Sequence, residues 1–255
     1  MKLKNYHLEG EEKIISPAMI YYRDAIVENT KRTIELAGSV DRLWYHVKTH
    51  KCRELVTMQR QMGFTHFMCA TIAEAEMAAS VGAEQVMVAY ALVGPNIGRF
   101  IALTLGMPNT QFWALGDDVE TLRLLSDAAA EKGITVPVLL DVNVGQDRTG
   151  VPLKKVPEVF PLCAKLPGLK LRGMHCYDGH NHQIDLADQI QSSQRLTDDH
   201  LQGIETEIIV DIATVDGDGT GAALIQANAG DGRLTATGAV LILSLALVHS
   251  LLPPD

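Results

Sequence analysis

The chain alternates between short apolar runs and longer segments in which apolar residues recur every three or four positions. The short runs are rich in β-branched and other apolar side chains, and such runs are typical of buried strands. The longer segments have one apolar and one polar face, as amphipathic helices do. The runs predict strands at residues 18–22, 43–47, 67–71, 85–90, 111–115, 136–142 and 170–177.

Helices are predicted between most of these strands, with the clearest patterns at residues 26–37, 73–81 and 119–132. Thr71 precedes the second helix, and the sequence TIAE that ends at Glu74 has the form of a capping box. Asp117 or Asp118 can cap the third helix, and Gly133 can end it.

Strands that alternate with helices predict βα units and a parallel sheet. About six such units precede residue 190, which fits either most of a (β/α)8 barrel or a doubly wound sheet. No G-x-G-x-x-G sequence follows the first predicted strand, so nothing favours a dinucleotide-binding fold.

The composition changes after about residue 205, where lysine and aromatic residues disappear and Gly, Ala, Thr and Asp dominate. The sequence predicts two parts, a barrel domain at residues 1–205 and an atypical segment at 206–255. Two interpretations of the segment stay open. Residues 207–213 and 239–248 are the last barrel strands joined by a glycine-rich loop, or the tail is foreign to the fold encoded before it.

The net charge and the lengths of the apolar runs argue against two classes of partner, nucleic acids and membranes. The net charge of −9 and the lack of a concentrated basic stretch argue against nucleic-acid binding. The run 239–248 is shorter than the ~20 residues that span a bilayer, and the N-terminus lacks the apolar run of a signal peptide. The four cysteines have no metal-type spacing, so we expect reduced thiols in a cytoplasmic protein.

The sequence LWYHVKTHK, at residues 43–51, contains two candidate reactive lysines. Lys48 directly follows a predicted strand, and the carboxyl ends of barrel strands form the active-site rim. A lysine beside aromatic and other cationic groups can act as a nucleophile. The alternative is a surface lysine after a strand. Lys51 is expected to be solvated at the start of the next helix.

Two further strand ends carry polar side chains. Arg148 follows the strand at 136–142 and can bind an anionic or polar group, or pair with Asp147 or Asp141. The strand at 170–177 carries His175 and Tyr177, and His180 and His182 follow it without a zinc-binding pattern. Gly94, Pro95 and Gly98 (residues 89–100) fit a turn that starts a helix better than a phosphate cradle.

Five segments together resemble the D-threonine aldolase-like and D-serine dehydratase-like enzymes of the alanine racemase class, which depend on pyridoxal phosphate (PLP). They are HVKTHK, CATIAEAEMA, YALVGPNIGRF, DVNVGQDRTG and LRGMHCYDGH, in the family's order over residues 10–200. The resemblance implies a (β/α)8 TIM-type barrel that binds PLP, here without the family's C-terminal β domain and with an incomplete barrel as an alternative. It implies a lyase acting on small D-β-hydroxy amino acids, and it leaves a homodimer open.

The resemblance also assigns site residues. Lys48 matches the lysine that binds PLP covalently, and Arg148 matches the arginine near its phenolic oxygen. Tyr177 matches the tyrosine against the cofactor ring, and His175 is a weaker match. Trp44 and Tyr45 depart from the family's usual R-P before the H-x-K motif, which should alter the pocket wall.

The resemblance ends before two later family features. The segment that grips the PLP phosphate is not found, and His249 has no cysteine partner to match the family's metal ligands, so no metal site is predicted although the family uses a divalent metal. A frameshifted or truncated C-terminus would explain both observations. A non-catalytic PLP-binding protein with a single barrel, or an inactive fragment, is the alternative function.

Overall fold

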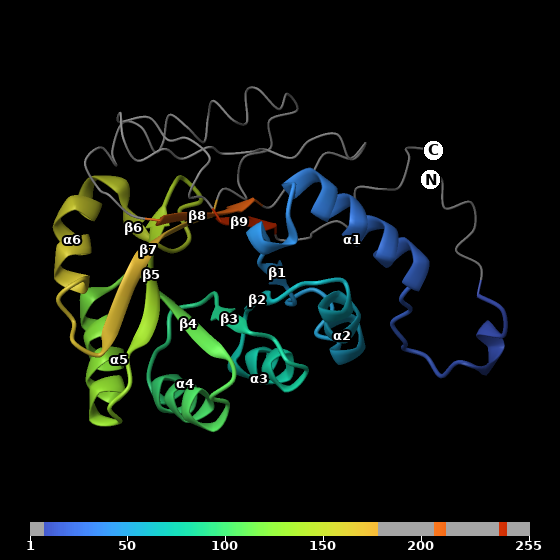
Figure 1. The fold of residues 1–255 in the computed structure, drawn as a ribbon, viewed down its shortest axis with the longest axis horizontal. Helices are drawn as coiled ribbons and strands as arrows, with labels where there is room; N and C mark the ends of the chain where they lie inside the picture. Colours follow the sequence, from blue (N-terminus) through green and yellow to red (C-terminus); the bar gives the residue numbers. More distant parts are fainter. Residues whose placement is uncertain (1–7, 178–206, 213–239, 244–255) are drawn as a thin grey trace.

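The computed structural model describes residues 8–177, 207–212 and 240–243. Its strands form one parallel sheet, with the helices outside it (Figure 1). The strands are β1 (Tyr45–His46), β2 (His66–Cys69), β3 (Gln85–Val88), β4 (Gln111–Gly116), β5 (Val136–Asn143), β6 (Val151–Pro152), β7 (Leu169–Tyr177), β8 (Glu207–Ile212) and β9 (Val240–Leu243). The helices are α1 (Arg23–Ala37), α2 (Arg53–Gln61), α3 (Ile72–Ser80), α4 (Pro95–Gly106), α5 (Val119–Glu131) and α6 (Val156–Cys163), with short 3-10 turns η1 (Glu11–Lys13), η2 (Val40–Arg42) and η3 (Leu153–Lys155).

The strand order is that of a barrel. Eight strands are paired in the order β1-β2-β3-β4-β5-β7-β8-β9, every pair is parallel, and β6 pairs with β5 off this path. The last strand, β9, lies beside β1 and η2, so the path curves back towards its start. This arrangement confirms the predicted α/β barrel and excludes the doubly wound alternative, in which the two edge strands lie far apart.

Strands β8 and β9 lie where the sequence allowed two final barrel strands, at 207–213 and 239–248. Backbone pairing joins β7 to β8 from Gly173↔Glu207 to Tyr177↔Asp211, and β8 to β9 from Ile209↔Val240 to Ile212↔Leu243. The domain boundary at residue 205 stays a prediction.

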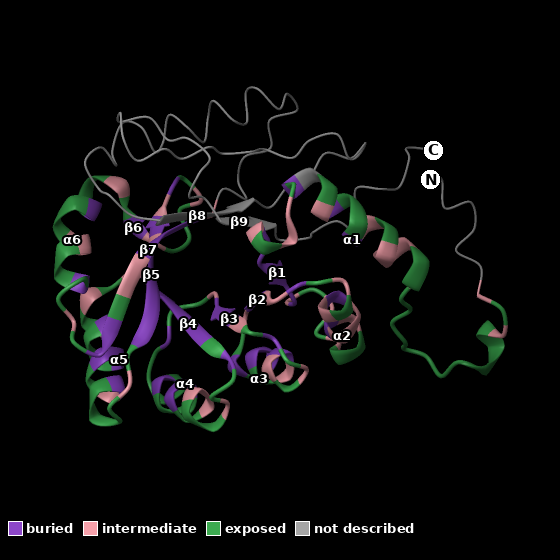
Figure 2. Ribbon diagram, in the orientation of Figure 1, coloured by how far each residue is buried: buried purple, intermediate pink, exposed green. Residues whose placement is uncertain are grey.

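Buried apolar side chains form two clusters, one between strands and helices and one inside the barrel. Figure 2 shows that the buried residues lie mainly on the strands and on parts of the helices. The interior cluster contains Trp44, Met68, Met87, Trp113, Leu115 and Leu139, all buried. Trp44 and Trp113 meet edge to face, with ring centroids 5.6 Å apart, a favoured aromatic geometry. Trp44 therefore belongs to the barrel core, and Tyr45 faces the helices among the other buried residues. The expectation that these two residues alter the wall of the pocket stays a prediction.

The capping predictions hold with one refinement. Thr71 Oγ1 accepts the Glu74 N–H at 3.2 Å, and Asp118 Oδ1 accepts the Thr121 N–H at 2.7 Å. Asp118 is thus the cap of α5, and Asp117 has a different role. The Glu74 carboxylate accepts from the N–H of Ala70, one residue before the position that a standard capping box uses.

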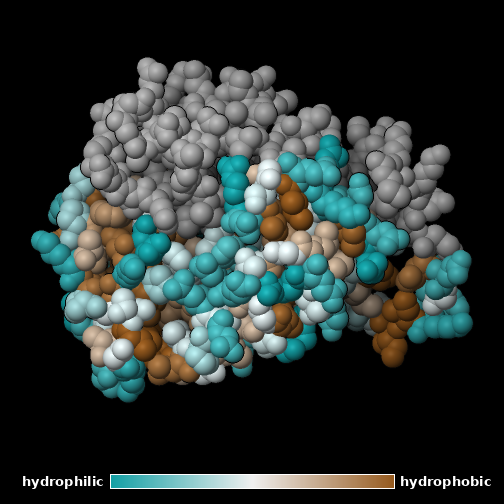
Figure 3. All heavy atoms as spheres, in the orientation of Figure 1, coloured by the Kyte–Doolittle hydropathy of each residue, from teal (hydrophilic) through white to brown (hydrophobic). Residues whose placement is uncertain are grey.

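The strand predicted at residues 18–22 is wrong. Within the part of the chain that the structure describes, this segment pairs with no strand, and α1 begins directly after it, at Arg23. Its apolar side chains are exposed, with Met19 at 72% and Ile20 at 43% exposure, and Figure 3 shows hydrophobic surface at this projecting end. Apolar composition alone predicts burial, but a strand also requires a hydrogen-bonded partner.

Candidate functional site

Lys48 lies in the connection that follows β1, as the sequence predicts. Its backbone N–H donates to His46 Nδ1 at 3.2 Å, and the N–H of Val47 donates to the carbonyl of Met68 at 2.9 Å. Burial, aided by the positive charge of Lys48, lowers the pKa of His46 to about 3. His46 is therefore neutral near pH 7, which its role as an acceptor at Nδ1 requires.

Lys48, Arg148 and Tyr177 come together although they lie on three different strand ends. Lys48 Nζ is 5.8 Å from the centroid of the Tyr177 ring, and Arg148 Cζ is 5.1 Å from it. Both distances are within the range of cation–π attraction. The carboxyl ends of parallel strands share one rim of a barrel, so residues more than a hundred positions apart meet there.

His175 lies on the same rim, next to Asp141. The two residues are register partners on β5 and β7, and His175 Nδ1 is 2.7 Å from Asp141 Oδ1. His175 is 5% exposed. A carboxylate at this distance orients an imidazole and fixes which nitrogen carries the proton. The sequence had offered Asp141 as a partner for Arg148, and the β5–β7 register explains why Asp141 lies beside His175.

Sequence reasoning missed two residues that shape the loop bearing Arg148. Asn143 Oδ1 accepts the N–H groups of Gly145 at 2.9 Å and Asp147 at 3.2 Å, and its amide donates to Asp147 Oδ1 at 3.0 Å. Asp117 Oδ2 accepts the N–H of Gly150 at 2.9 Å. These bonds fix the loop at both ends. An Asx-type residue at the end of β5 was the available signal for Asn143.

A small hollow, open to solvent, adjoins this rim at the ends of β3, β4 and β5. Three charged side chains, those of Asp117, Asp141 and Arg148, contribute to its wall. The other lining residues are Ala89, Tyr90, Ala91, Leu115, Gly116 and Thr149. A hollow that combines a few convergent polar groups with apolar walls suits a small ligand.

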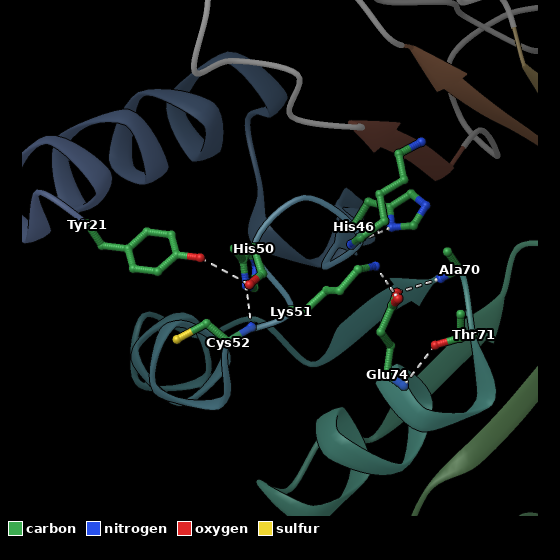
Figure 4. Close-up of polar contacts among 9 residues, drawn as sticks. Tyr21, His46, His50, Lys51, Cys52, Ala70, Thr71 and Glu74 are labelled. Atoms are coloured by element: carbon green, nitrogen blue, oxygen red, sulfur yellow. Dashed lines mark hydrogen bonds and ion pairs between the residues drawn. The ribbon is translucent and has the colours of Figure 1, made fainter. Parts of the chain in front are cut away.

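Lys51 is exposed to solvent, as expected, with 56% of its side chain accessible, but it precedes the next helix and also has an ion-pair partner. Helix α2 begins at Arg53, and Lys51 Nζ forms an ion pair with Glu74 at the start of α3 (Figure 4).

Gly94 lies at a helix start, as the sequence predicts. It has a φ of 54° and directly precedes Pro95, the first residue of α4, so this segment is a turn that starts a helix.

Among the described residues, no group of three or more His, Cys, Asp or Glu side chains could hold a metal ion. His180, His182 and His249 lie outside the described residues. Within the same described ranges, no helix is long and apolar enough to cross a membrane.

The chain belongs to the family defined by the N-terminal domain of alanine racemase, whose profile matches residues 22–238. It is similar to a D-threonine aldolase from Arthrobacter sp., with 27% identity over 191 residues, 72% of this chain and 49% of that protein. It is also similar to a 3-hydroxy-D-aspartate aldolase from Paracoccus denitrificans (strain Pd 1222), with 26% identity over 86% of this chain and 58% of that protein. The chain spans about half the length of the curated relatives it matches.

Solved structures agree on the fold. The crystal structure of D-threonine aldolase from Filomicrobium marinum superposes with a TM-score of 0.73 at 24% identity, covering 91% of this chain and 62% of that chain. D-threo-3-hydroxyaspartate dehydratase from Delftia sp. HT23 superposes with a TM-score of 0.71 at 18% identity, covering 91% and 60%. These similarities establish the barrel of the alanine racemase class.

Proposed function

We propose that this chain is the barrel of a PLP-dependent lyase that cleaves or dehydrates small D-β-hydroxy amino acids. The observation that carries the proposal is the approach of Lys48 and Arg148 to one aromatic ring, that of Tyr177, at the carboxyl rim of the barrel. The relatives that match include an aldolase of D-threonine and aldolases and a dehydratase of 3-hydroxy-D-aspartate.

The side chains present fit this cofactor chemically. PLP is a flat aromatic aldehyde with a phenolic oxygen, and it requires an amine, a flat contact and a positive charge near that oxygen. Lys48 would supply the amine, Tyr177 the flat contact and Arg148 the positive charge. When bound, PLP acts as an electron sink that makes the bonds at the substrate Cα easier to break.

The remaining residues would orient groups around Lys48. His46, which is neutral, accepts the backbone N–H of Lys48 and so fixes the start of the turn that carries the amine. Asp141 would hold His175 in one orientation, as a carboxylate does for a histidine that binds or moves a proton. The hollow beside Arg148, with its charged and apolar walls, would accept the amino acid substrate.

The residues that we assign to this site are Lys48 as the catalytic residue and, with Arg148, His175 and Tyr177, as the PLP-binding residues. A divalent metal is expected for the family. Free thiols at Cys52, Cys69, Cys163 and Cys176 support a cytoplasmic location.

Trapping with borohydride tests the proposal. The purified chain is mixed with PLP, reduced, digested and examined by mass spectrometry, with K48A and K51R measured beside it. We expect the reduced adduct on Lys48, its loss in K48A and its retention in K51R. An adduct that persists in K48A, or none in the wild type, would refute the site.

Turnover is then measured with D-threonine, 3-hydroxy-D-aspartate and D-serine, with and without Mn²⁺. Glycine plus an aldehyde indicates an aldolase, and a 2-oxo acid plus ammonia indicates a dehydratase. A Lys48 adduct without any turnover would instead favour a non-catalytic PLP-binding protein.

A further inference from the structure

The turn that carries Lys48 ends at a residue with an unusual backbone. Lys51 has a φ of 48°, in the left-handed region that residues other than Gly, Asn and Asp seldom occupy. Its N–H donates to the carbonyl of Val47 at 2.9 Å, so one backbone hydrogen bond encloses Lys48. A left-handed residue persists where its surroundings hold it in place. The contacts of the Lys51 side chain therefore bear on where Lys48 lies.

The Lys51 side chain reaches across to the next strand-to-helix connection. Its Nζ pairs with Glu74 Oε1, and Glu74 Oε2 accepts the N–H of Ala70 at 2.8 Å, just beyond the end of β2 (Figure 4). The N–H of Glu74 also donates to Thr71 Oγ1. The carboxylate is thus fixed to α3 and to the end of β2. Through Lys51, it links the β1–α2 turn to the β2–α3 turn.

The two partners differ in exposure, which sets this pair apart from an ordinary surface salt bridge. The Glu74 side chain is 5% exposed, whereas the Lys51 side chain is 56% exposed. A buried carboxylate is costly to leave unpaired, so it strongly favours a nearby cation and donor. An exposed pair, in contrast, contributes little because water competes for both charges.

From these contacts we propose that Lys51 and Glu74 are positioning residues for Lys48: their ion pair holds the turn so that the Lys48 amine points towards Tyr177. The inference rests on the proposed function, because it assigns a role within the same PLP site. Neither residue touches the cofactor in this proposal. A purely structural ion pair would stabilise the fold without affecting the amine.

Three substitutions separate these roles. E74Q keeps an oxygen for the Ala70 N–H but removes the charge that pairs with Lys51. K51M keeps the aliphatic stem and removes the cation, whereas K51R restores it. The control is E84Q, which removes a different ion pair, Arg60 NH2–Glu84 Oε1 at 3.6 Å, on a segment away from the Lys48 turn.

Affinity for PLP is measured from the visible absorbance of the lysine-bound cofactor, together with its circular dichroism, which reports how rigidly the cofactor is held. We expect E74Q and K51M to bind PLP about tenfold more weakly, equivalent to roughly 1.4 kcal/mol, and to lose part of the dichroic signal. K51R should recover most of both, and E84Q should match the wild type. E74Q and K51M with wild-type affinity and dichroism would overturn the proposal, even if they were less stable.

Hydrogen exchange without PLP makes the outcome independent of the proposed function. The Lys51 amide, whose acceptor is Val47, should exchange faster in E74Q and K51M than in E84Q. If the wild type forms no PLP adduct, the proposed function fails, and this measurement alone decides whether the pair holds the turn. An unchanged exchange rate of the Lys51 amide in E74Q and K51M would then show that the Lys51–Glu74 ion pair does not hold the turn.

Discussion

The loop that presents Arg148 depends on the absence of a side chain at Gly150. This residue has a φ of 98°, and a Cβ placed there would lie 2.4 Å from the backbone N of Asn143 and 2.6 Å from the carbonyl carbon of Val142. Both neighbours are backbone atoms, so neither can rotate away. Gly150→Ala must therefore either strain the loop or displace it.

The cost follows from these two features. The positive φ costs an alanine about 1–3 kcal/mol, and overpacking against backbone costs about 1–3 kcal/mol more. A displaced loop would avoid the clash but would break the hydrogen bond from the Gly150 N–H to Asp117, worth about 1.5–3 kcal/mol with a charged acceptor. Either response is large beside a total stability of about 5–15 kcal/mol. Displacement would also move Arg148 away from Tyr177.

Urea unfolding and PLP titration measure both responses, with Gly133→Ala as the control. Gly133 also has a positive φ, of 67°, but a Cβ there would meet no atom within 4 Å. We expect a loss of about 1–2 kcal/mol for Gly133→Ala, the cost of a left-handed backbone alone, with unchanged PLP affinity. Gly150→Ala should lose at least about 2 kcal/mol or bind PLP more weakly. Equal stability and equal affinity in the two variants would refute the reasoning.

Three further predictions follow from particular contacts. Burial lowers the pKa of His46 from 6.5 to about 3, so the unfolded chain binds this proton first as the pH falls. Between these two pH values the free energy of unfolding should fall by up to about 1.4 kcal/mol per pH unit. In His46→Asn, chemical unfolding at several pH values should show a smaller dependence of that free energy on pH. Asp118→Ala should lose about 1 kcal/mol of stability because the Thr121 N–H loses its acceptor, and an unchanged thermal midpoint would contradict this. Tyr177→Phe should keep PLP affinity near the wild-type value and Tyr177→Leu should lower it, because Lys48 and Arg148 both approach the ring; equal titrations for the two variants would count against the ring contact.

The relation between sequence and structure is clearest at the strands. The run at 136–142 is apolar except for Asp141, and only a sheet covered on both sides buries such a run, so local composition was enough to predict β5 and its parallel neighbours. The run at 18–22 has similar composition and forms no strand. Pairing depends on a neighbour in space, and composition does not specify one.

The candidate site, like the strands, was predicted from the sequence only in part. The sequence by itself determined that Lys48, Arg148, His175 and Tyr177 follow or end strands, because strand periodicity is a local property. Only the tertiary structure decided which groups meet. It placed Lys48 and Arg148 beside the Tyr177 ring. The β5–β7 register placed Asp141 next to His175.

Lys51 is the residue for which the tertiary structure changed the interpretation most. Its sequence context, three residues after a strand-end lysine and just before a helix, indicated a solvated side chain. The side chain is exposed, but it also has an ion-pair partner, Glu74, which lies 23 positions away and becomes buried only when α3 packs against the sheet. Burial removes competing water from the carboxylate, so the ion pair exists because of packing, which no local pattern in the sequence encodes.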